Sequence, residues 1–163
     1  MCEVEGMQEK FMKEAIKEAK KAQSKDEVPI GCVIVKDGKI IARGHNLRET
    51  KMNSLLHAEI IAINKSCKKL KNFRLENCEL YVTVEPCLMC AGAIVQSRIK
   101  KVYFGTPDEK YGAVVSVCNA FDVKSNHKVE FEQGLLCIQC QTIVKDFFKS
   151  LREKKKEEKS CCR

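Results

Sequence analysis

One stretch of the chain, from Cys78 to Gly105, restricts the fold more than any other. It reads CELYVTV, then PCLMCAGAIVQS after a single glutamate, then KKVYFG. These are a largely apolar β-rich run, a helix-forming segment of about a dozen residues and a second β-rich run. Two strands joined by a helix lie parallel in one sheet with a right-handed crossover, so the stretch predicts a βαβ unit.

The remaining segments add elements on either side of this unit. Apolar residues at steps of three and four predict a helix over about Gln8–Gln23, and a second one from a Ser54 cap to about Leu70. Two β-rich runs around residues 36–38 predict a hairpin, and HKVEFE at 127–132 is a fifth strand. A C-terminal amphipathic helix is expected to end near Leu151. The sequence therefore predicts an α/β protein with three layers and a mixed five-stranded sheet.

Length and composition fit one domain. With 163 residues, 44% of them hydrophobic, the chain can bury one core. We assign residues 1–151 to the domain and residues 152–163 to a basic C-terminal tail. The N-terminus has no apolar signal region, and no run approaches the roughly 18 apolar residues of a membrane span. We expect a cytoplasmic protein with no membrane partner, whose 11 cysteines are reduced thiols.

The formal net charge of +8 favours an anionic partner. Two segments concentrate it: residues 65–74, with five Lys or Arg and no acid, and residues 145–163, with eight Lys or Arg against four Asp or Glu. Both suit a phosphate backbone. Each is equally compatible with a solvated helix face.

Cys87 and Cys90 stand three positions apart at the start of a helix that we expect to begin at Pro86. A CxxC pair alone fits half of a structural zinc site, a redox dithiol or two core cysteines. His57, thirty positions earlier, also falls in the first turn of a predicted helix. Catalytic zinc takes three nitrogen or thiolate ligands and a water, and a helix start favours thiolates, so His57, Cys87 and Cys90 are candidate zinc ligands.

Glu59 follows two residues after the candidate histidine ligand. A carboxylate there can take a proton from a metal-activated water and pass it to a substrate. The alternatives are a closed structural site with Glu59 as fourth ligand, or a buried histidine beside two core cysteines. H-x-E followed by P-C-x-x-C is the signature of zinc-dependent nucleobase deaminases, and all five specified positions are present.

Beyond these motifs, the chain resembles the bacterial tRNA-specific adenosine deaminases from Met7 to about Leu151. The resemblance includes EVPIG, ARGHNLRET, LYVTVEPCLMCAGA, SRI, VYFG, the Asp108-x-Lys110-x-Gly112 loop, NHKVE and DFFKSLR. It implies a cytidine-deaminase-like α/β/α fold, one Zn²⁺ per subunit, a homodimer, and a tRNA anticodon stem-loop whose wobble adenosine is hydrolysed to inosine. It also implies Glu59 as the proton carrier and six substrate-binding residues: Val28, Asn46, Ala58, Val84, Asp108 and Phe148.

Two features depart from the family pattern: Val115, where a glycine is usual, and the CIQC pair, Cys137 and Cys140. The HAE and PCxxC motifs also occur in cytosine, guanine and cytidine deaminases, so they indicate the chemistry only. A deaminase of free guanine or cytosine, or of a nucleoside, is therefore the rival enzyme. An RNA-binding module or inactive partner subunit is the rival without activity, and the carboxylate of Glu59 argues against it.

Overall fold

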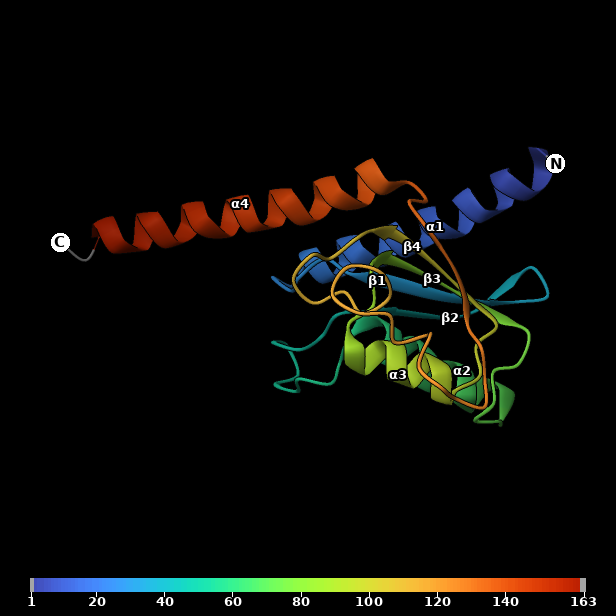
Figure 1. The fold of residues 1–163 in the computed structure, drawn as a ribbon. Coiled ribbons are helices and arrows are strands. Elements are labelled where there is room, and N and C mark those ends of the chain that lie inside the picture. Colours follow the sequence, from blue (N-terminus) through green and yellow to red (C-terminus); the bar gives the residue numbers. More distant parts are fainter. Residues whose placement is uncertain (1, 162–163) are drawn as a thin grey trace.

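The computed structural model describes residues 2–161, with the side chains of residues 6–158 (Figure 1). In chain order, its elements are α1 (Cys2–Gln23), β1 (Gly31–Lys36), β2 (Lys39–His45), α2 (Ala58–Leu70), β3 (Cys78–Val84), α3 (Leu88–Gln96), β4 (Lys101–Thr106), β5 (Glu130–Gln133) and α4 (Cys137–Cys161). All the predicted strands and helices form.

The five strands make one mixed sheet in the order β2-β1-β3-β4-β5. β1 runs antiparallel to β2 and β3, whereas β3, β4 and β5 are mutually parallel. The predicted βαβ unit is thus β3-α3-β4. The β1-β2 turn has φ of 50° at Asp37 and 69° at Gly38, the positive values that a two-residue type I′ turn needs.

Helices cover both faces of the sheet, α1 and α4 on one side and α2 and α3 on the other (Figure 1). Successive side chains of a strand point to opposite faces, which creates two cores. Towards α1 and α4 point Val33, Val35, Tyr81 and Tyr103. Towards α2 and α3 point Cys32, Ile34, Leu80, Val82, Val102 and Phe104. The expected three-layer α/β/α fold is confirmed.

The last helix is longer than predicted. α4 continues to Cys161 instead of ending near Leu151. The added residues are mostly Lys and Glu, which have high helix propensity, and no glycine or proline interrupts them. Apolar periodicity marks where a helix packs, which is a shorter span than the helix itself. In the described part of the chain, no helix is long and apolar enough to cross a membrane.

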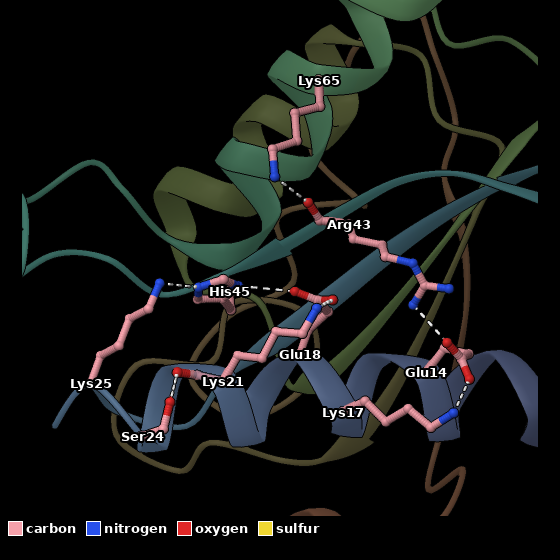
Figure 2. Close-up of polar contacts among 9 residues, drawn as sticks. All are labelled: Glu14, Lys17, Glu18, Lys21, Ser24, Lys25, Arg43, His45 and Lys65. Carbon is pink, nitrogen blue, oxygen red and sulfur yellow. Dashed lines mark hydrogen bonds and ion pairs between the residues drawn. The ribbon is translucent and has the colours of Figure 1, made fainter.

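Polar contacts fix β2 to α1 (Figure 2). The buried carboxylate of Glu18 lies 2.9 Å from Nδ1 of His45, and Arg43 pairs with Glu14 at 2.7 Å. His45 ends β2, and Asn46 follows it directly. These contacts fix the C-terminal end of β2. It lies at the same end of the sheet as the C-terminal ends of β3 and β4.

Candidate active site

Two helices begin at this end of the sheet, each with a candidate metal ligand at its N-cap. The N-cap of α2 is His57 and that of α3 is Cys87. The predicted starts at Ser54 and Pro86 are therefore wrong by a few residues. A ligand at the N-cap lies beside the free N–H groups of the first turn, whose partial positive charge favours a thiolate.

The three candidate ligands converge. The ligand atoms of His57, Cys87 and Cys90 all lie within 4.8 Å of one another. Nδ1 of His57 is 3.7 Å from Sγ of Cys87 and 3.5 Å from Sγ of Cys90. Tetrahedral zinc, with Zn–S of about 2.3 Å and Zn–N of about 2.0 Å, separates such atoms by about 3.5 Å. The donors and their spacing therefore fit zinc.

The two sulfurs differ in acidity. A hydrogen bond from Cys90, helped by one from His57, outweighs burial and lowers the pKa of Cys87 to about 4. The same hydrogen bond to Cys87, together with burial, raises the pKa of Cys90. The hydrogen bond to Cys87 also raises the pKa of His57, against the effect of burial. Cys87 is thus the more acidic of the two thiols.

Glu59 lies in the first turn of α2, with only 3% of its surface exposed. Burial is the main cause that raises its pKa to about 7. Its carboxylate is outside the group of converging ligand atoms. This placement fits a proton carrier better than a fourth ligand.

Asn46 connects β2 to the start of α2. Its Oδ1 accepts a hydrogen bond from the backbone N–H of Ala58 at 2.9 Å, and its side chain is buried. His57 makes no capping bond with its own side chain. Asn46 therefore caps α2 from a distant part of the chain, which leaves the imidazole free to face the cysteines.

The other predicted substrate residues are less closely grouped. Ala58 and Val84 are buried next to the ligands, at the start of α2 and the end of β3. Val28 is half-buried in the turn before β1, and Asp108 lies in the loop after β4. Phe148 lies apart from Asn46 and from these four residues. It is 40% exposed on α4, where its ring packs edge-on against Phe147.

The remaining histidines and the CIQC pair do not join the centre. His45 contacts Glu18, and Nε2 of His127 lies 2.8 Å from the carbonyl of Ile99. Cys140 is buried in the α1/α4 core and Cys137 is half-buried. Among the side chains of residues 6–158, only the His57 group brings three donors for a metal together, so Cys137 and Cys140 form no second centre of that kind there.

Sequence reasoning missed two buried carboxylates that hold loops beside the centre. Glu27 accepts a hydrogen bond from the backbone N–H of Thr50 at 2.7 Å. Glu85 binds the loop after β4. Burial raises the pKa of Glu85, but its hydrogen bonds from Ser116, Val115 and neighbouring groups lower it further, to below the usual value. For Glu85, the available signal was an acid directly after an apolar strand, whereas Glu27 lies in the connection between α1 and β1 and follows no strand.

The Val115 departure leaves that loop intact. The backbone N–H of Val115 donates to Oε1 of Glu85 at 2.7 Å, and the valine side chain is 41% exposed. Val115 is not among the described residues with positive φ, so its conformation does not require glycine.

The chain is similar in sequence and fold to known deaminases. A profile of the MafB19-like deaminases matches residues 7–152. A tRNA-specific adenosine deaminase of Bacillus subtilis is 52% identical over 91% of this chain and 92% of its own length. The tRNA-specific adenosine deaminase of Aquifex aeolicus is 48% identical over 88% of this chain and 95% of its own length. A structure from studies of A-to-I editing by tRNA:A34 deaminases superposes with a TM-score of 0.79 and 42% identity, covering 82% of this chain and 97% of that one.

Proposed function

The chain belongs to the tRNA-specific adenosine deaminase family, and we propose that it converts the wobble adenosine of a tRNA anticodon to inosine using one zinc ion per chain. The observation that supports the hydrolytic chemistry is the distance of Nδ1 of His57 from the two sulfurs, which fits tetrahedral zinc, beside the buried carboxylate of Glu59. A structural zinc site has no use for that carboxylate. The choice of a tRNA substrate rests on the relatives named above.

The reaction adds water at the adenine carbon that bears the amine and releases ammonia. When bound, zinc acts as a Lewis acid that lowers the pKa of water. Glu59 takes a proton from the attacking water and returns one to the departing amine. Its pKa of about 7 suits both transfers near neutral pH, because a general base works best when its pKa is close to the ambient pH.

The surrounding residues orient the base. Oδ1 of Asn46 is engaged by Ala58, so the NH₂ group of the same amide supplies the donors for a purine nitrogen. Val28, Ala58 and Val84 form apolar walls. Asp108 lies beside the flanking nucleotide, and Phe148 borders the anticodon loop. A flipped base is needed because the target carbon is unreachable inside a stack.

The C-terminal part of α4 is a basic segment that extends on the same side of the molecule as the site (Figure 1). Lys154 contacts Asp26 at 3.3 Å. Asp26 lies in the turn directly before Glu27, whose carboxylate binds the loop before α2. In Figure 1 this end of α4 extends on the side where α2 and α3 begin. The cluster at 65–74 lies at the opposite end of α2, about 18 Å along the helix axis. We assign the phosphate contacts to α4.

We further propose a cytoplasmic homodimer. Leu88 and Tyr111 are 64% and 61% exposed. Cys87 and Gly112 form an antiparallel bridge. Leu88 follows Cys87 and Tyr111 precedes Gly112, so the two exposed side chains are neighbours beside the site. Exposed apolar side chains grouped in this way are typical of a protein interface.

The decisive experiment offers the zinc-loaded protein an anticodon stem-loop with a wobble adenosine, in parallel with free adenine, adenosine, guanine and cytosine. We expect inosine in the stem-loop, with almost no conversion of the small molecules. Binding should weaken with salt, with a log-log slope of about −0.7 per phosphate contact. Salt-independent turnover of a free base with the stem-loop untouched would support the rival enzyme.

A further inference from the structure

Glu85 is a buried carboxylate that the proposed chemistry does not use. It follows β3 directly, stands two residues before Cys87 and is 3% exposed. Its own N–H donates to the carbonyl of Thr106 at 2.8 Å, which joins it to the end of β4. The carboxylate is thereby held between the metal-binding segment and the loop that follows β4.

Five donors from that loop converge on this one carboxylate. The backbone N–H groups of Asp108, Val114, Val115 and Ser116 donate to it at 2.7 to 3.0 Å, and the hydroxyl of Ser116 donates as well. Hydrogen bonds to an ionised acceptor are about twice as strong as neutral ones. One side chain therefore satisfies four of the nine backbone N–H groups of residues 108–116, a segment that has no regular secondary structure.

The loop is also attached to the metal-binding segment by its backbone. Gly112 forms a bridge with Cys87, and the N–H of Ala113 donates to the carbonyl of Pro86 at 2.9 Å. No side chain fits at position 112, since a Cβ there would lie 2.2 Å from Oε2 of Glu85. The carboxylate, the glycine and Cys87 thus form one close-packed unit.

We propose that Glu85 is a positioning residue, which acts by holding the loop 108–116 beside Cys87 so that Asp108 meets the nucleotide next to the target base. This inference rests on the proposed function for its substrate, but the loop contacts stand independently of it. Because its oxygens are occupied by loop donors, Glu85 neither binds the metal nor carries protons.

The test compares Glu85→Gln with wild type, both loaded with zinc. We expect hydrogen exchange of the 108–116 backbone amides to accelerate about tenfold or more, with α2 and β3 unchanged. The KM for the substrate that wild type turns over should rise about tenfold while kcat changes less than about threefold. Ser116→Ala removes one donor and retains the others, so it should give a smaller KM rise even if Glu85→Gln folds poorly.

Glu18→Gln is the matched control. Glu18 is equally buried, at 3% exposure, but its partners are Lys21 and His45 on the α1 side (Figure 2). It should lose stability without a change in the hydrogen exchange of the 108–116 amides. Unchanged exchange in Glu85→Gln would overturn the proposal, as would a loss of zinc and kcat at constant KM. If wild type leaves the stem-loop untouched, the proposed function fails, yet the exchange experiment still decides whether Glu85 holds the loop.

Discussion

Three of the buried glutamates, Glu27, Glu59 and Glu85, differ in acidity because different groups act against burial. At Glu59, burial and the nearby Cys87 outweigh a backbone hydrogen bond, His57 and Cys90, and the pKa rises to about 7. Burial also raises the pKa of Glu27 and of Glu85, but backbone N–H groups and hydroxyls lower both to below the ordinary value. Glu59 is therefore suited to moving protons, whereas Glu27 and Glu85 are suited to holding loops. Burial alone does not decide what a carboxylate does.

Glu59→Gln should retain the fold and one zinc per chain but lose the reaction. General acid/base help is worth about 10² to 10⁴ in rate, and the amide cannot carry the proton. The measurement pairs metal analysis with single-turnover deamination of the stem-loop. Cys87→Ala is the comparison, since it should lose zinc and activity together. An active Glu59→Gln enzyme would refute the role.

Glu27→Gln should change how stability depends on pH. The ordinary pKa of this carboxyl is 4.5 and the folded value lies lower, so its contribution is complete above about pH 4.5. It is lost as pH falls through the folded pKa. We expect the variant to be about 1.5–3 kcal/mol less stable at pH 7, with the difference shrinking towards pH 3. Urea unfolding at both pH values measures it, and a constant difference would contradict the assignment.

At the scale of elements, the centre depends on where two helices begin. Each N-cap is set by tertiary contacts, α2 by Asn46 and α3 by the bridge between Cys87 and Gly112. Helix starts read from propensity fall at Ser54 and Pro86 because those rules consider only neighbouring residues. The cap that matters for α2 comes from twelve positions away.

Truncation after Leu151 should weaken binding of the stem-loop and flatten its salt dependence. It removes six Lys or Arg and three Asp or Glu, a net change of −3. The loss of three phosphate contacts should reduce the steepness of the log-log slope by about 2. Replacing Lys68, Lys69 and Lys71 by alanine changes the charge equally but at the far end of α2. Equal effects of both variants in a salt titration would show that total charge matters and position does not.

For the molecule as a whole, the sequence was sufficient to predict the sheet, the three layers and which three side chains converge as candidate metal ligands. The signals were local ones: apolar periodicity, the βαβ unit and the spacing of the H-x-E and P-C-x-x-C motifs. Tertiary packing agrees with each of them. The sequence did not predict that α4 passes Leu151, because exposed Lys and Glu extend a helix without an apolar stripe. It also did not predict what Glu27 and Glu85 bind, since backbone donors leave no trace in residue types.

The loop after β4 is held through its backbone N–H groups, so its path does not depend on which side chains it carries. Every residue except proline supplies an N–H group, so Glu85 can hold many different sequences in one conformation. Val115 already shows this, with its amide bound and its side chain turned outward. Evolution, or a mutant library, can therefore vary positions 109, 115 and 117 in search of new nucleotide preferences without having to rebuild the fold.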